Sequence, residues 1–189
     1  LRSQGYQVMG GDCGFRSGRT AHRFFAEFVS RGFDGIVFHD VHRHIDLTAL
    51  RQGLSVPHVI LSPHVDDQES DVGVDTEQGG YIAAKHLVDH GHRRIGYIRI
   101  GPHETRHRLK GWSRALREAG VDDHERFLFC LRDFDGSADA LLDEFRRRRV
   151  TAAFTQNDSV AAKVMNAFLQ RGVRVPDDVA IIGFDGSSF

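Results

Sequence analysis

The stretch VGVDTEQGGYIAAKHLVDHGHRRIGYIRI, residues 72–100, decides the fold of this chain. It predicts a strand at 72–75, a helix at 76–90 and a second strand at 94–100. In the helical part Ala83, Ala84, Leu87 and Val88 fall on one face. Asp75 can cap the helix, with Gln78 reaching back as in a capping box. A strand, a helix and a second strand in this order favour a parallel α/β fold.

The same alternation continues on both sides of this stretch. Helical segments are expected at 17–31, 106–119, 137–149 and 158–170, and Gly172 suits the end of the last one. Most strand-like runs are continuously apolar, as in strands that helices cover on both faces. These runs lie at 6–10, 35–39, 58–62, 126–131, 151–155 and 179–184.

We therefore expect an α/β fold with doubly wound parallel sheets flanked by helices. Eight strands are many for one small sheet, so two lobes fit better than one. We place the lobes at residues 1–91 and 92–189, joined near Gly91–His92. The chain opens on LRSQGYQV and closes on IIGFDGSSF just after a strand, so we expect an internal piece of a longer protein, with both lobes incomplete.

The composition excludes several classes of protein. The net charge is −1, from 25 basic and 26 acidic residues, which gives no general attraction to nucleic acid or membrane. No apolar run approaches the length of a membrane span, and no signal peptide is visible. Two cysteines, Cys13 and Cys130, lie far apart and fit reduced, buried thiols.

Residues 103–107 spell the zinc-protease pattern H-E-x-x-H. That chemistry needs both histidines on one helix, one turn apart. Here Gly101 and Pro102 end a strand, and the next helix begins at about Thr105, so His103 falls in a loop and His107 in the helix. We expect no metal at this pattern.

Other histidines and a run of arginines have plain explanations. His39, His42 and His44 share a loop, and His86 and His90 are four residues apart on a helix. Either group could bind zinc adventitiously, but a solvated loop and an exposed helix end are favoured. Four arginines at 146–149 end a helix, where cations suit the dipole. The sequence also lacks the nucleophile elbow and both glycine-rich phosphate motifs, so we expect neither an enzyme nor a cofactor.

Polar side chains follow the predicted strands, at the edge where open α/β sheets bind ligands. Carboxylate, amide and guanidinium groups with one aromatic face suit a small polyhydroxylated ligand. Each has an alternative role: a helix cap for Asn157 or Asp158, a solvated cation for Arg106, and an ordinary turn for Asp185. The residues are Arg106, Arg108, Phe134, Asn157, Asp158 and Asp185.

The sequence resembles the LacI/GalR family of transcriptional regulators over nearly its whole length. The resemblance rests on VGVDTEQGGYIAAKHLVDHGHRRIGYI (72–98), RLKGWSRALREAG (108–120) and AAFTQNDSVAAKVMNAFLQRGVRVPDDVAIIGFDGS (152–187), with GYQVMGG and SRGFDGIVFHD before them. It implies a two-lobed fold like that of periplasmic sugar-binding proteins, with an effector in the cleft. A helix-turn-helix for operator DNA, absent from this chain, and a homodimer are also implied.

The resemblance also implies an effector site. It assigns ligand-binding roles to Arg108, Asn157, Asp185, Phe134 and, from the first lobe, Asp75. Ser62 and Gly186 stand where many members of the family carry acids. No metal is expected.

The expected function is that of an effector-sensing domain of a cytoplasmic repressor that binds a sugar or sugar derivative. The alternative is a periplasmic sugar-binding protein that serves a transporter. A signal peptide upstream, in place of a helix-turn-helix, would identify that alternative.

Overall fold

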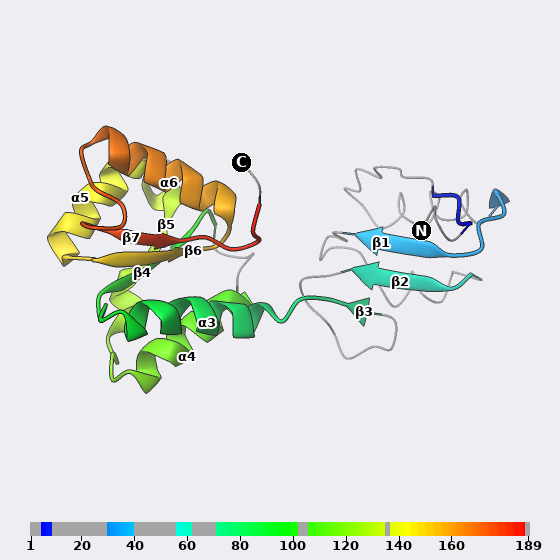
Figure 1. The fold of residues 1–189 in the computed structure, drawn as a ribbon, viewed down its shortest axis with the longest axis horizontal. Coiled ribbons are helices and arrows are strands. Elements are labelled where there is room, and N and C mark those ends of the chain that lie inside the picture. The colour runs from blue at the N-terminus through cyan, green and yellow to red at the C-terminus, as the bar shows by residue number, and fades with distance from the viewer. Residues whose placement is uncertain are drawn as a thin grey trace. The chain divides into compact units, whose positions relative to one another are not determined.

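The computed structural model describes residues 5–8, 30–39, 56–61, 71–101, 106–134 and 137–187. The chain divides into two compact units, Leu1–Val74 (unit 1) and Asp75–Phe189 (unit 2). Figure 1 shows the elements of each unit.

Unit 1 contains a three-stranded parallel sheet in the order β1-β2-β3. Its strands are β1 (Ile36–His39), β2 (His58–Leu61) and β3 (Asp71–Val72). Phe38 and Ile60 are buried at its centre. The strand expected at 6–10 is wrong for Tyr6–Val8, which are exposed and pair with no strand in the described part of the chain.

Unit 2 is built on a four-stranded sheet in the order β5-β4-β6-β7, and all three strand pairs are parallel. Two helices cover each face of it: α3 and α4 lie on one side and α5 and α6 on the other (Figure 1). The strands are β4 (Ile95–Arg99), β5 (Leu128–Cys130), β6 (Ala152–Thr155) and β7 (Ala180–Ile182). The helices are α3 (Thr76–Asp89), α4 (Arg106–Glu118), α5 (Ala138–Arg148) and α6 (Asp158–Gln170).

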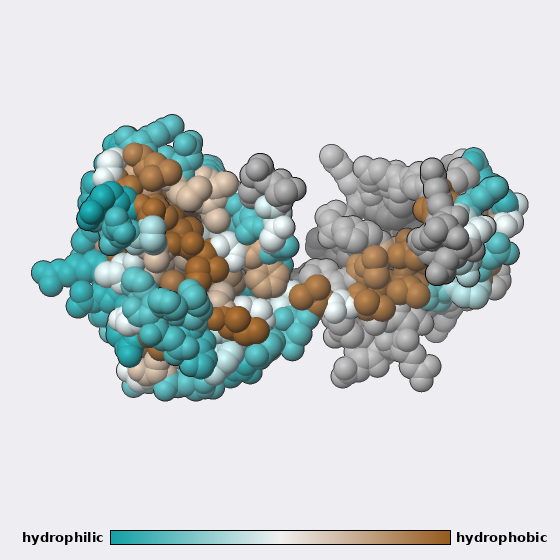
Figure 2. All heavy atoms as spheres, in the orientation of Figure 1, coloured by the Kyte–Doolittle hydropathy of each residue, from teal (hydrophilic) through white to brown (hydrophobic). Residues whose placement is uncertain are grey.

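The expected α/β architecture with parallel sheets is confirmed, and in the described residues helices flank the sheet of unit 2. The core of unit 2 is rich in aromatic rings that meet edge-on or tilted, among them Tyr97 with Trp112 and Phe145 with Phe168. Hydrophilic residues cover most of the face of unit 2 seen in Figure 2, and hydrophobic residues gather between α6 and α3, where β7 runs. The side chains of β7, Ala180–Ile182, are part-exposed.

The strand β5 is shorter than the expected run at 126–131. The residues at both ends of the expected run instead belong to two 3-10 helices, η2 (His124–Phe127) and η3 (Leu131–Phe134). The His124 ring is buried and meets Ser113 Oγ through Nε2 at 2.5 Å and the Val121 carbonyl through Nδ1 at 2.8 Å. These bonds hold the segment before β5 in a turn, so the strand begins only at Leu128.

Helices α3 and α4 approach each other at a contact made of glycine. A Cβ added to Gly111 of α4 would clash with the Glu77 carbonyl, and one added to Gly80 of α3 would clash with the Arg108 carbonyl. The two backbones therefore touch without side chains between them. The compact units divide between Val74 and Asp75, and this contact joins α3 to α4 within unit 2. The lobe boundary near Gly91–His92 stays a prediction.

Candidate functional site

The carboxyl ends of the four unit 2 strands lie at one edge of the sheet, because all the strands are parallel. The segments that leave this edge begin after Arg99, Cys130, Thr155 and Ile182. Ligands of open α/β sheets bind at such an edge. We call it the carboxyl edge of unit 2.

Arg108, in the first turn of α4, is held at this edge by three contacts. Its guanidinium donates a short hydrogen bond to the Gln156 carbonyl. Its central carbon lies 3.9 Å from the centroid of the Phe184 ring. Its Nη2 lies 3.5 Å from the Asp185 carboxylate. With the side chain only 16% exposed, the guanidinium is fixed in direction and still reaches solvent.

The Phe184 ring also packs against the backbone of α3 at Gly79. A Cβ added to Gly79 would lie 2.5 Å from Cε2 of this ring, so only glycine leaves room for it there. Phe184 also meets Phe154 of β6 with ring centroids 6.3 Å apart. The aromatic surface under Arg108 is therefore fixed by the sheet and by the first turn of α3.

Gln156 and Phe184 are functional candidates that the sequence analysis missed. Gln156 is buried at 3% exposure, and its Oε1 accepts a 2.8 Å bond from the Ile100 backbone, which ties the ends of β4 and β6 together. A backbone carbonyl acceptor carries no sequence signal. Phe184 stands directly before Asp185, but an apolar residue at the end of an apolar strand reads as core.

The sequence left open whether Asn157 or Asp158 caps the helix that follows, and the structure gives the two residues different roles. Asn157 caps α6, its side-chain oxygen accepting from the Val160 backbone at 3.0 Å. Asp158 is the first helical residue, and its backbone N–H donates to the Phe184 carbonyl at 2.9 Å. Its Oδ2 accepts from the Ser187 backbone at 2.7 Å. Asp158 thus fixes the backbone of residues 184–187, which we call the Asp185 loop.

Asp185 occupies a costly position in this loop. Its φ is 108°, a backbone conformation that favours glycine. Burial raises the pKa of its carboxyl, Arg108 opposes that shift, and the like charge of Asp158 adds to it. Asp185 thus combines a strained backbone with a carboxylate whose charged form is disfavoured, and it lies at the carboxyl edge of the sheet. This combination is typical of functional positions.

Replacing Asp185 by glycine is expected to stabilise unit 2 by roughly 0.5–1 kcal/mol at pH 7, since it relieves backbone strain and removes a disfavoured charge. Loss of the ion pair between Arg108 and Asp185 reduces this gain only slightly, because the two groups are 3.5 Å apart and Asp185 is 45% exposed. Urea unfolding followed through Trp112, the single tryptophan and 1% exposed, measures this.

The Asp185→Asn variant separates the two causes, because it removes the charge and keeps the side chain. The raised pKa means that the carboxyl favours folding at acid pH and that this benefit is lost as pH rises through the folded-state pKa. The gain from Asp185→Asn should therefore appear at neutral pH and vanish in acid. A loss of stability in Asp185→Gly would contradict the strain argument, and the absence of a gain at neutral pH in Asp185→Asn would contradict the charge argument.

The remaining expected residues are Asp75, Phe134 and Arg106, and all three belong to unit 2. Asp75 caps α3, accepting from the Gln78 backbone at 2.8 Å, and is the first residue of unit 2. The Gln78 side-chain oxygen accepts from Arg114 at 3.0 Å instead of closing a capping box. Phe134 ends η3 beyond β5, half-buried against the core. Arg106 is exposed at the start of α4.

Several sequence-level expectations fall outside the described residues. They concern Cys13, His42, His44, Ser62, His103, Glu104 and Thr105. Helix α4 begins at Arg106, within one residue of the expected start, and carries His107. Cys130 is a buried free thiol that donates to the Ile100 carbonyl at 3.3 Å. Within the described ranges, no three histidine, cysteine or acidic side chains could share a metal ion. No helix in those ranges is long and apolar enough to cross a membrane.

Comparison with known proteins places this geometry in context. Residues 84–189 match the family model of the periplasmic binding protein-like domain. The chain is 36% identical to the HTH-type transcriptional regulator DegA of Bacillus subtilis over 176 residues, which cover 87% of this chain and 51% of DegA. It is 34% identical to the HTH-type transcriptional repressor PurR of Photobacterium profundum over 149 residues, or 75% of this chain and 43% of PurR.

The fold has solved counterparts as well. The transcriptional regulator CelR, solved in complex with cellobiose, superimposes with a TM-score of 0.73 at 29% identity, covering 91% of this chain and 55% of CelR. The chain spans about half the length of the curated relatives that it matches. These relatives are regulators of transcription, in agreement with the expectation that the chain is not an enzyme.

Proposed function

Because the chain belongs to the periplasmic binding protein-like domain family, among the LacI/GalR transcriptional regulators, we propose that it senses a small sugar-like effector for a DNA-binding repressor. The observation that carries this proposal is the Arg108 guanidinium, which lies on the Phe184 ring and 3.5 Å from Asp185. A fork of donors, a carboxylate acceptor and an aromatic face are the groups that recognise hydroxyl-rich rings.

The proposed binding residues are Arg108, Asn157 and Asp185, with Phe134 and Asp75 further along the edge. Arg108 donates to ring or hydroxyl oxygens, and the Asp185 carboxylate accepts from hydroxyls. The Asn157 oxygen already caps α6, so its amide N–H₂ is the group left for a ligand. A sugar is favoured as the ligand class because the structural relative CelR was solved with cellobiose.

The proposed mechanism is a shift between two conformations of the full-length regulator. A ligand moves such an equilibrium only by its differential affinity for the two states. We also propose that the full-length protein binds operator DNA through a helix-turn-helix outside this chain. In this proposal it is a homodimer located in the cytoplasm. The cleft between two lobes and the lobe boundary near Gly91–His92 remain predictions. The transporter alternative is not favoured by the relatives, which are regulators.

The test uses the full-length gene product. Its preferred duplex is selected from random DNA, and its affinity is measured by fluorescence anisotropy with and without cellobiose and a panel of neutral monosaccharides. One sugar is expected to change the operator Kd by about 5- to 150-fold. Absence of sequence-selective DNA binding would overturn the regulator assignment. Selective binding that no sugar alters would overturn the ligand class alone.

A further inference from the structure

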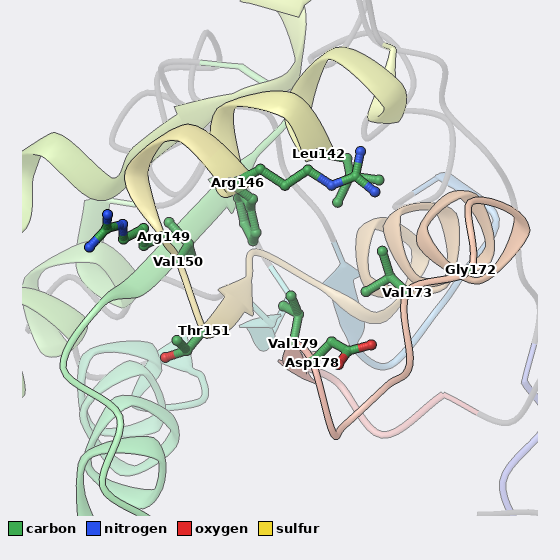
Figure 3. Close-up of a pocket in the computed structure, with 10 residues that line it drawn as sticks. Leu142, Arg146, Arg149, Val150, Thr151, Gly172, Val173, Asp178 and Val179 are labelled. Atoms are coloured by element: carbon green, nitrogen blue, oxygen red, sulfur yellow. The ribbon is translucent and has the colours of Figure 1, made fainter.

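A pocket of about 320 Å³ lies in unit 2, and Figure 3 shows the residues that line it. Thr151 and Val179, which line it, directly precede β6 and β7, so it lies at the amino ends of these strands. We call it the amino-edge pocket. The end of α5 forms one wall and the segment 172–179 contributes the other. Its size falls at the lower end of the range of small-molecule sites, about 300–1,000 Å³.

The walls of this pocket are mainly apolar. Its five apolar residues come from α5, from the segment between α5 and β6 and from the segment before β7, and each is at most 9% exposed. Apolar surface that already faces a pocket favours an occupant with an apolar body. The apolar lining residues are Leu142, Phe145, Val150, Val173 and Val179.

The rim of the pocket carries positive charge, because Asp178, the acidic residue that lines it, is already paired with Arg174. The Asp178 carboxylate accepts from the Arg174 guanidinium at 2.6 and 3.1 Å and from the Arg174 backbone at 2.8 Å. These bonds lower the pKa of Asp178, so it stays ionised and neutralised by its partner. Among the residues that the structure describes, the ion partner of Arg146 is the Asp143 carboxylate at 3.7 Å, in a pair whose side chains are 60% and 81% exposed. Such a pair is weak and leaves the guanidinium available.

The two arginines that line the pocket differ in direction. Figure 3 shows Arg146 extended along the α5 side of the pocket, toward Leu142, whereas the Arg149 side chain points the other way. Arg149 is the C-cap of α5 with φ 53°. The negative end of the α5 dipole lies nearby and opposes an anion. Recognition of an anion therefore depends on Arg146.

We propose that the amino-edge pocket binds a small carboxylate with an apolar body, a second ligand distinct from the effector at the carboxyl edge. The carboxylate accepts the forked hydrogen bonds of Arg146, and the apolar body lies against the exposed parts of Val150, Val173 and Val179. This site does not depend on the proposed sugar effector, because it shares no residue with the carboxyl edge.

The probe is sodium benzoate, with benzamide as the neutral molecule of the same shape. Titration of the ¹⁵N-labelled chain followed by NMR should give saturable shifts at Thr151, Val173 and Val179, with a Kd on the order of 1 mM. Arg146→Gln should weaken benzoate about tenfold or more, since bonds to charged groups contribute roughly 1.5–3 kcal/mol. Benzamide should bind the wild type as weakly as benzoate binds this variant.

Arg147→Gln is the matched control, because Arg147 is one residue away and is directed to Glu144, at 2.6 Å. It should leave the benzoate affinity unchanged, and Val173→Phe, which fills the pocket, should abolish it while the dispersion of the other amide signals shows a folded chain. Equal loss in the Arg147 and Arg146 variants would indicate general charge attraction and overturn the site. So would shifts confined to the Arg108 end, or none at the pocket.

Discussion

Replacement of Gly111 by alanine is expected to destabilise unit 2 by about 3 kcal/mol. The new methyl would clash with the Glu77 carbonyl and lie 2.5 Å from the Tyr81 backbone nitrogen. Neither is the flexible end of a side chain, so two helices must separate to admit it. Helix propensity alone predicts the opposite sign, a gain of about 1 kcal/mol from glycine to alanine. The sign of the measured change therefore decides whether the contact between α3 and α4 exists.

The measurement is urea unfolding followed by circular dichroism and by Trp112 fluorescence. Lys110→Ala is the control, because Lys110 is the preceding residue of α4 and is exposed. It should change stability by no more than about 0.5 kcal/mol. Gly80→Ala should repeat the large loss, since its methyl would meet the Arg108 carbonyl from the other helix. A Gly111→Ala protein as stable as the wild type would show that α3 and α4 do not touch there.

The second large effect concerns Arg108. Its replacement by alanine is expected to weaken effector binding by about 100-fold, because a directed, mostly buried guanidinium leaves ligand acceptors unpaired when it is removed. The chain should remain folded, since the contacts of the Arg108 side chain are to a carbonyl, a ring face and a single carboxylate. Calorimetric titration with the sugar that alters operator binding gives the affinity.

Two further variants separate binding from structure. Arg106→Ala removes an exposed cation in the same turn and should leave the affinity unchanged. Arg108→Lys keeps the charge but loses the planar fork and the stacking on Phe184, so it should restore only part of the affinity. If Arg108→Ala binds the effector as tightly as the wild type, the carboxyl edge near Arg108 is not the effector site.

The elements that the sequence predicts best are those with the strongest local signals. The helix at 158–170 matches α6, because its apolar face and its terminal Asn157 and Gly172 all lie within one segment. The strands β4 and β6 are buried along almost their whole length, as their continuous apolar runs indicate. Helix α3 was also predicted to within one residue of its end. Fold class and order follow from these segments.

Tertiary contacts explain what the sequence did not predict. The place of α3 in unit 2 depends on Gly80 and Gly111, and a glycine within a helix does not show by itself what it faces. The direction of Arg108 is set by a carbonyl, which every residue possesses. Of the candidate pair Asn157 and Asp158, either could cap a helix by type. The hydrogen bond from the Ser187 backbone to the Asp158 carboxylate shows that Asp158 binds the loop and does not cap the helix. This bond joins residues far apart in sequence, so the sequence does not reveal it.

The bonds that Asp158 makes to the Asp185 loop bear on how ligand preference could be redesigned. One backbone N–H and one carboxylate oxygen fix the course of the loop, at 2.9 Å and 2.7 Å, and neither bond uses a side chain of the loop. Substitutions that alter the chemistry of Ser187 or Asp185 therefore leave that course intact. Asp158 is the position to hold constant in a biosensor library, and the loop side chains are the positions to vary.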